Sequence, residues 1–114
     1  MPYVQIRTSN RFEKERELAI KERLGRAITL LGKTEQWLMV EFVPSCTMYM
    51  GGDNMKEIAY VSVKLLGKSN DNAYNEFTKE VTDMLVSNCQ NMNPSDVYIS
   101  YDEYDRWGWN GSNL

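Results

Sequence analysis

Hydrophobic and polar residues alternate near the start of the chain and then recur at helical spacing. The alternation from Tyr3 to Thr8 predicts a β-strand. The charged segment that follows carries an apolar stripe typical of an amphipathic helix: Ile20, Leu24, Ala27, Ile28 and Leu31. Asn10 and Glu13 have the spacing of a capping box at its start, and Gly32 suits a left-handed cap at its end. A second strand is predicted from Leu38 to Val43.

The same order of elements returns in the second half of the chain. Residues from Ile58 to Leu65 and from Val97 to Tyr101 predict two further strands. Between them lies a second apolar stripe with helical spacing: Ala73, Phe77, Val81, Met84 and Leu85. A nearly constant offset superposes the two halves and carries Val4 to Val61, so we predict an internal duplication.

These elements predict a single α+β domain over residues 1–114, built from two β-α-β repeats. The repeats span approximately 2–43 and 58–102, and 103–114 form a C-terminal hairpin segment. Two right-handed crossovers side by side give a ferredoxin-like, four-stranded sheet with both helices on one face. The strands are rich in Val, Ile, Met and Tyr, so we expect the uncovered face to be apolar and to be buried in an oligomer.

Composition and charge exclude several classes of protein. Hydrophobic residues make up 42% and charged residues 25% of the 114 positions, which is typical of a globular domain and not of a disordered chain. The net charge is −3 and no free basic run is present, so neither nucleic acid nor an anionic membrane surface is expected as a partner. No apolar segment approaches the length of a membrane span.

The N-terminal residues and the cysteines bear on where the protein resides. The start of the chain lacks the apolar core of a secretory signal, so we expect a cytoplasmic protein, with release by a route that needs no signal peptide as the alternative. Cys46 and Cys89 are far apart in the chain and are expected to be reduced packing residues.

The chain contains no histidine, which removes the commonest general base and most zinc sites. A different base is available if the initiator methionine is removed, because Pro2 would then present a secondary amine. An α-amino group titrates near about 8, and burial beside a cation lowers that pKa toward neutrality. Such an amine suits proton abstraction next to a carbonyl group. Position 2 alone is weak evidence for this role.

Six short motifs occur in order along the whole chain: Met1-Pro2, Leu31-Gly32-Lys33, Met50-Gly51-Gly52, Leu66-Gly67-Lys68, Val97-Tyr98-Ile99 and Gly108-Trp109-Asn110-Gly111-Ser112. No single one is specific. Together, at this spacing, they resemble the macrophage migration inhibitory factor family. The resemblance implies the tautomerase fold, a homotrimer, and an isomerase that needs no metal or organic cofactor. It also implies keto–enol tautomerisation of small aromatic 2-keto acids such as phenylpyruvate.

The resemblance assigns roles to individual residues. It makes Pro2 the catalytic base and Lys33 the ligand of the substrate carboxylate, although a lysine just beyond a helix end is also explained by the helix dipole. It gives the backbone N–H of Leu66 a part in holding the carboxylate. Tyr98 and Ser100 share one face of the last strand and would be contributed by the neighbouring subunit.

Two tryptophans, Trp37 and Trp109, are expected to form aromatic walls of the pocket. Several positions depart from the family pattern. Ser100 replaces a common asparagine, and Leu114 replaces a C-terminal aromatic residue. The redox Cys-x-x-Cys is missing, with Ile58 and Val61 in its place, so no thiol–disulfide activity is expected.

Three alternatives remain open from the sequence. In the first, the protein acts chiefly as a cytokine-like or host-modulating binder of a protein receptor, and its pocket is vestigial. In the second, it is a ferredoxin-like ligand-binding or assembly module in which Pro2 is incidental. In the third, it is an enzyme related to the tautomerases that catalyses dehalogenation or decarboxylation, for which Arg7, Arg11 and Lys64 offer extra cations.

Overall fold

The first half of the chain folds as a strand, a helix and a parallel strand. The computed structural model describes residues 1–114. In it β1 (Pro2–Thr8) is followed by α1 (Lys14–Ala27), which continues as a 3₁₀ turn over Ile28–Leu31. Gly32 ends this turn with φ +74°, a conformation that glycine adopts without steric cost, as predicted. The chain then returns through a 3₁₀ turn (Glu35–Trp37) to β2 (Met39–Val43), which pairs with β1.

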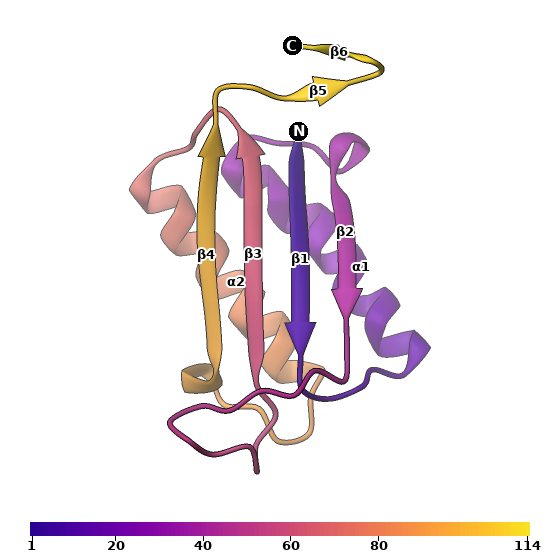
Figure 1. The fold of residues 1–114 in the computed structure, drawn as a ribbon, viewed down its shortest axis with the longest axis vertical. Helices are drawn as coiled ribbons and strands as arrows, with labels where there is room; N and C mark the ends of the chain where they lie inside the picture. Colours follow the sequence, from indigo (N-terminus) through magenta and orange to yellow (C-terminus); the bar gives the residue numbers. More distant parts are fainter.

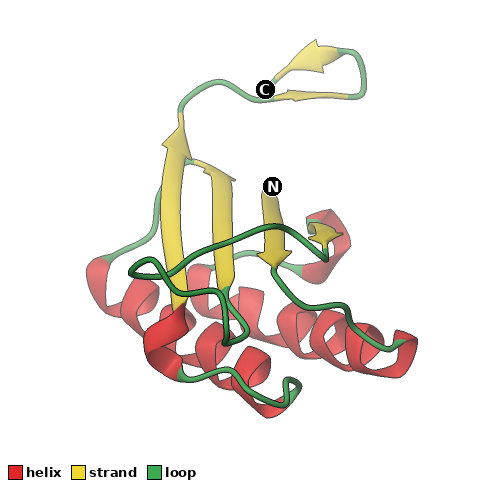
Figure 2. Cartoon of the chain, turned by 60° about the horizontal axis from the view of Figure 1, so that its bottom comes forward, coloured by secondary structure: helices red, strands yellow, loops and turns green.

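The second half repeats this arrangement with β3 (Ala59–Leu66), α2 (Asp71–Ser87) and β4 (Val97–Tyr104). A 3₁₀ turn over Pro94–Asp96 precedes β4. The two halves join through the antiparallel pair of β1 and β3, which gives the strand order β2-β1-β3-β4. Both helices cover the same face of this sheet (Figures 1 and 2). The α+β fold with two helices on one face is therefore confirmed.

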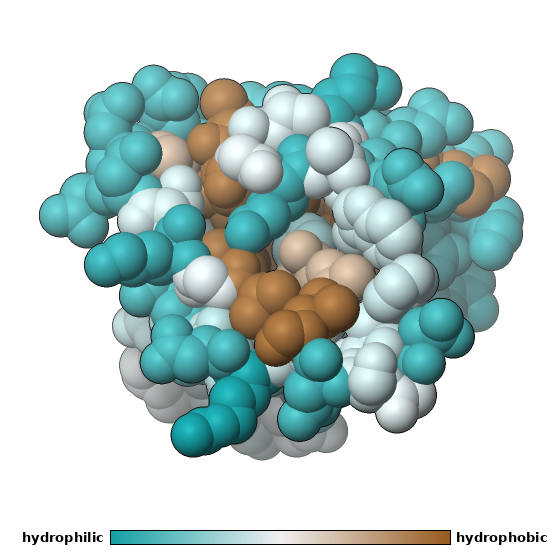
Figure 3. Space-filling view, turned by 90° about the horizontal axis from the view of Figure 1, so that it is seen from above, coloured by the Kyte–Doolittle hydropathy of each residue, from teal (hydrophilic) through white to brown (hydrophobic).

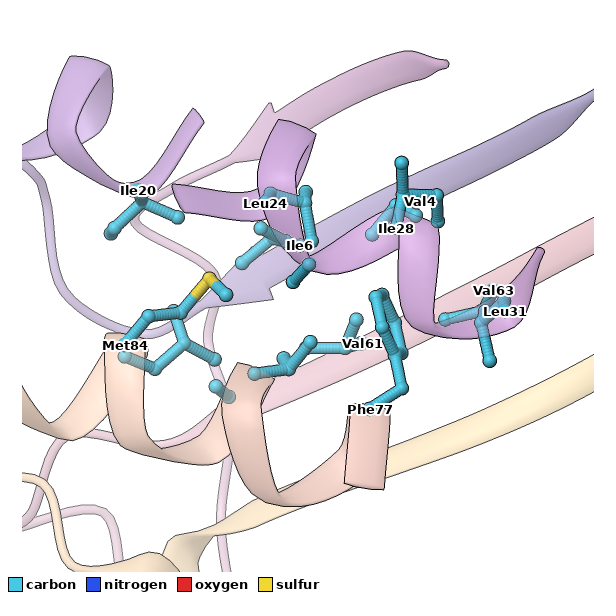
Figure 4. Packing of buried hydrophobic residues seen from close by; sticks show 14 of the residues in the cluster. Val4, Ile6, Ile20, Leu24, Ile28, Leu31, Val61, Val63, Phe77 and Met84 are labelled. Carbon is cyan, nitrogen blue, oxygen red and sulfur yellow. The ribbon is translucent and has the colours of Figure 1, made fainter. Parts of the chain in front are cut away.

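The hydrophobic core lies between the sheet and the two helices. Seventeen buried residues form one cluster, and side chains from β1, β3, α1 and α2 meet in it (Figure 4). Phe77 and Met84 of α2 point toward Ile6 and Val61 of the two central strands, and all four are fully buried. The stripes of both predicted helices contribute to the cluster. Burial of this apolar surface holds the helices against the sheet.

The predicted start of the first helix is wrong. Glu13 occupies the N-cap position without a side-chain hydrogen bond, and α1 begins at Lys14. Asn10 is held elsewhere, because its backbone oxygen accepts a hydrogen bond from Thr8 Oγ1 over 2.8 Å and its Nδ2 contacts Cys89 Sγ at 3.7 Å. The turn after β1 thus uses Asn10 and delays the helix. At α2, by contrast, Asn70 caps the helix with its side chain.

The uncovered face of the sheet is more polar than composition suggests. Strand alternation turns the β-branched residues toward the helices and leaves tyrosines and polar side chains outside. Tyr3 and Gln5 both donate to Glu41, and Lys64 pairs with Asp102 over 3.0 Å. The expectation of a large apolar patch on this face is therefore incorrect, although single tyrosines are exposed there.

A short C-terminal hairpin crosses above the N-terminus (Figure 1). Its strands are β5 (Gly108–Trp109) and β6 (Ser112–Asn113). Asn110 and Gly111 connect them with φ values of +53° and +84°, the signature of a tight type I′ turn. No helix is long and apolar enough to cross a membrane.

Candidate functional site

Pro2 begins β1, a central strand, and is buried beneath the C-terminal hairpin. A cavity of about 370 Å³ opens beside it and is lined mainly by apolar and aromatic residues: Met1, Pro2, Tyr3, Gln36, Trp37, Leu38, Met39, Trp107, Gly108 and Trp109. Viewed from above, this end of the molecule has an apolar patch surrounded by less hydrophobic residues (Figure 3). The structure thus brings Pro2, Trp37 and Trp109 to one cavity.

The two tryptophans of the prediction contact each other. The rings of Trp37 and Trp109 lie edge to face, with centroids 5.1 Å apart and an interplanar angle of 87°. This geometry is favourable for aromatic pairs. Because Trp37 follows the first helix and Trp109 lies in the C-terminal hairpin, the contact fixes the hairpin over the cavity.

Sequence reasoning missed Trp107, which lines the cavity from the segment between β4 and β5. Its ring packs against Tyr104, with centroids 6.0 Å apart. Its carbonyl oxygen accepts a hydrogen bond from the N–H of Leu114 over 2.9 Å. The repeat of tryptophan two positions apart, at 107 and 109, was the available sign that both line the same site. Met39 and Leu38 of the β2 segment were missed as well.

Lys33 and Leu66 meet at the first residue of the chain. The backbone N–H of Leu66 donates to the carbonyl oxygen of Met1 over 3.2 Å, and Lys33 Nζ donates to the carbonyl oxygen of Leu66 over 2.9 Å. Leu66 is half-buried and follows Leu65, which pairs with Pro2 at the start of β1. A polar end of the site, with one cation and one backbone donor, therefore adjoins the aromatic cavity.

The amino terminus is electrostatically perturbed. Burial lowers the pKa of the Met1 amine below its ordinary value of 8.0, and the positive charge of Lys33 lowers it further. Both influences favour a neutral amine. They come from the surroundings of the N-terminus and not from the methionine side chain.

Tyr98 and Ser100 lie far from Pro2 in the same chain. Tyr98 is opposite Tyr60, which is opposite Arg7, so it stands about 16 Å from Pro2 along the strand direction. Tyr98 is 63% exposed, and the hydroxyl of Ser100 is hydrogen-bonded to that of Tyr60 over 2.7 Å. A single chain does not bring these two residues to the cavity.

Other hollows lack a comparable set of groups. A larger groove of about 600 Å³ runs between α1 and β2, but Lys14, Glu17, Lys21 and Glu35 on its rim are mixed in charge and solvated. No cluster of three or more histidine, cysteine or acidic side chains forms a candidate metal site. Cys46 and Cys89 are both free thiols. The cavity beside Pro2 is therefore the candidate functional site of this chain.

Comparison with known proteins agrees with this fold. The sequence model described as "Macrophage migration inhibitory factor (MIF)" matches residues 1–114, and the chain belongs to this family. No relative was found among curated protein sequences.

Solved structures of relatives share the fold. Leishmania major MIF2 is 23% identical with a TM-score of 0.91, and the match covers 100% of this chain and 97% of that one. A macrophage migration inhibitory factor homologue from Prochlorococcus marinus is 25% identical with a TM-score of 0.83, covering 97% of each chain. The protein Pt0534, crystallised after inactivation by 2-oxo-3-pentynoate, is 14% identical with a TM-score of 0.80, covering 96% of this chain and 93% of that one.

Proposed function

We propose that the protein is a keto–enol tautomerase of small aromatic 2-keto acids such as phenylpyruvate. The base would be the amine of Pro2 after removal of Met1. The observation that carries the proposal is the position of this residue: it is buried, it adjoins the Met1 amine whose pKa Lys33 lowers, and it is open to an aromatic cavity. We expect the burial and the Lys33 charge that lower the pKa of the Met1 amine to act on the Pro2 amine of the processed protein as well, and so to supply the neutral nitrogen that proton abstraction requires.

The hydrogen bonds of Met1 suggest where the substrate carboxylate would bind. In the full chain the carbonyl oxygen of Met1 accepts the N–H of Leu66, so it stands in for an anionic oxygen. Loss of Met1 would free this donor next to Lys33. A carboxylate there would gain a charge-assisted hydrogen bond and an ion pair. The aryl group would then lie among the tryptophans, which favour flat apolar rings.

The proposed reaction moves one proton between carbon and oxygen. Neutral Pro2 takes a proton from C3 of the 2-keto acid, the carbon next to the keto group, as the keto oxygen becomes an enol oxygen. The protonated amine, or water exchanging with it, then returns a proton to that oxygen, so no net proton is consumed. Lys33 and the N–H of Leu66 would hold the acid in place, and positioning of this kind contributes several kcal/mol to catalysis, on the order of 7 or more in favourable cases.

We further propose that the working form is a homotrimer. Tyr98 is exposed and Ser100 lies on the same outer face, both remote from the Pro2 of their own chain. A neighbouring subunit would bring them to the cavity. Their hydroxyl groups would then hydrogen-bond the carbonyl or enol oxygen.

The inactivation of Pt0534 by a 2-oxo acid supports the substrate class, because that protein shares the fold.

The test combines intact-mass measurement of the N-terminus with a phenylpyruvate assay. Protein that begins at Pro2 should interconvert keto and enol forms, and Pro2→Gly should lower kcat/KM by at least a hundredfold. Protein that retains Met1 should be inactive because its proline nitrogen is part of a peptide bond. Undiminished turnover in the Met1-retaining form would contradict the proposal. Negligible turnover by the processed protein would favour a cytokine-like binding protein.

A further inference from the structure

The polar end of the site carries positive charge. Lys33 is fixed there, because its Nζ donates to the carbonyl oxygen of Leu66 over 2.9 Å, and the N–H of Leu66 donates to the carbonyl oxygen of Met1 over 3.2 Å. The terminal amine lies beside this lysine. Burial and the charge of Lys33 both lower the pKa of the Met1 amine, because they make its ammonium form less stable. A further ammonium group brought to this place would meet the same two conditions.

The adjoining cavity offers no negative charge in return. The ten residues that line the Pro2 cavity include neither aspartate nor glutamate. Most of these side chains are apolar or aromatic, and the only carboxamide among them is that of Gln36. A cationic ligand group would therefore find no ion-pair partner in the lining.

The glutamates of nearby segments are bound or directed elsewhere. Glu35 lies in the turn before β2, but its carboxylate lies against Gly25 of α1, and the residue lines the separate groove between α1 and β2. Glu41 of β2 accepts hydrogen bonds from Tyr3 and Gln5. Neither carboxylate is available to the cavity.

The strand that a neighbouring subunit is proposed to contribute does not change this balance. Asp102 lies on the same face of β4 as Tyr98 and Ser100, but it forms an ion pair with Lys64 over 3.0 Å. Tyr98 and Ser100 themselves would bring hydroxyl groups. At the end of the chain, Leu114 is 59% exposed and does not line the cavity. The polar groups expected around a bound acid are thus cationic or neutral.

We propose that the Pro2 cavity accepts 2-keto acids and rejects the amino acids that carry an ammonium group in place of the keto oxygen. This inference rests on the proposed function, since it concerns the group next to the carboxylate of the same substrate. An amino acid bound through its carboxylate at Lys33 would place its ammonium group near the terminal amine. A charge that leaves water without a partner is costly, so the amino acid binds more weakly. The keto group is uncharged and avoids this cost.

The experiment compares two ligands that differ only in the group on the second carbon. L-phenyllactate carries a hydroxyl group there and L-phenylalanine an ammonium group, and neither is a keto acid. Isothermal titration calorimetry of the processed protein at neutral pH should show at least tenfold tighter binding of phenyllactate. Gln36→Glu introduces a carboxylate of similar shape into the cavity lining, so the ratio of the two dissociation constants should fall by at least fivefold.

Gln90→Glu is the matched control, because it makes the same change at an exposed residue that lines a different hollow. Its ratio should stay within about twofold of the wild-type ratio. Equal binding of the two ligands by wild-type protein, no binding of phenyllactate, or a ratio that Gln36→Glu leaves unchanged would overturn the inference. Turnover of phenylpyruvate is measured separately. Discrimination without turnover would reject only the proposed function, and turnover without discrimination would reject only this inference.

Discussion

Lys33 Nζ donates a hydrogen bond to the carbonyl oxygen of Leu66 over 2.9 Å, which joins the segment after the first helix to the end of β3. The lysine is thereby held beside the chain terminus with its charge directed at the amine. The side chain turns to the neighbouring strand, so it is not a helix-dipole partner alone, and its role as an anion ligand stays a prediction.

Lys33→Ala should raise KM for phenylpyruvate by at least tenfold, because the carboxylate loses its only cation within the site. Steady-state kinetics with processed protein measure this. Lys21→Ala removes an equal charge from an exposed position on α1 and serves as the control. Equal kinetics for the two variants would reject the assigned role of Lys33.

The acid limb of the pH profile should also move in Lys33→Ala. In processed wild-type protein we expect the burial and the Lys33 charge that lower the pKa of the Met1 amine to lower that of the Pro2 amine too, so kcat/KM should rise with pH through this lowered pKa, because only the neutral amine accepts a proton. Loss of the neighbouring positive charge makes the ammonium form easier to form, so the limb should shift to higher pH. Lys33→Arg keeps the charge and should keep the limb near its original position. An acid limb at the same pH in the alanine variant as in wild-type protein would contradict the electrostatic explanation.

Trp37 and Trp109 should be energetically coupled. Edge-to-face aromatic pairs contribute about 1 kcal/mol beyond the area they bury. A double-mutant cycle of Trp37→Ala and Trp109→Ala, followed by denaturant unfolding, should return a coupling free energy of about that size. Additive losses would show that the hairpin is held without this contact.

Phe77→Ala should lower the free energy of unfolding by about 3–5 kcal/mol, since its fully buried ring fills the centre of the core. Urea unfolding measures the change, and Phe77→Leu provides a smaller truncation if the alanine variant does not fold. Tyr49→Ala is the comparison at a position that is 63% exposed, where a change within about 0.5 kcal/mol is expected. Similar losses at both positions would be inconsistent with the core described here.

Cys89 should react slowly with iodoacetamide in the native protein. Burial, reinforced by the nearby charge of Glu57, raises the pKa of its thiol to about 11. At pH 8 the thiolate, which is the reactive form, is then a minor species of roughly one part in a thousand. Mass spectrometry of alkylated protein, with and without denaturant, should show labelling of Cys89 only after unfolding. Rapid labelling of the native protein would count against its burial.

The fold was predictable because its elements have a strong period. Both helical stripes and all four strands are present, and Gly32 and the Asn110-Gly111 turn have the backbone angles expected of them. The start of α1 was not predictable from Asn10, because that residue is recruited by the turn after β1 through Thr8. Local patterns do not reveal such competition between neighbouring turns.

Part of the site was predictable from the sequence, and the rest depends on tertiary contacts that the sequence pattern does not reveal. Pro2, Trp37 and Trp109 share a cavity, although they come from three separate segments of the chain. Trp107 was missed because its role depends on how the chain turns after β4, which carries no periodic pattern. The roles of Tyr98 and Ser100 remain predictions, since they require a second subunit.

The position of β1 inside the sheet has a practical consequence. Its first residue emerges between β2 and β3 and beneath the C-terminal hairpin, whereas Leu114 is 59% exposed (Figure 1). Any purification tag or fusion partner joined ahead of Pro2 would have to pass through the tryptophan-lined opening. Recombinant protein intended for assays should therefore be tagged at the carboxyl end or left untagged.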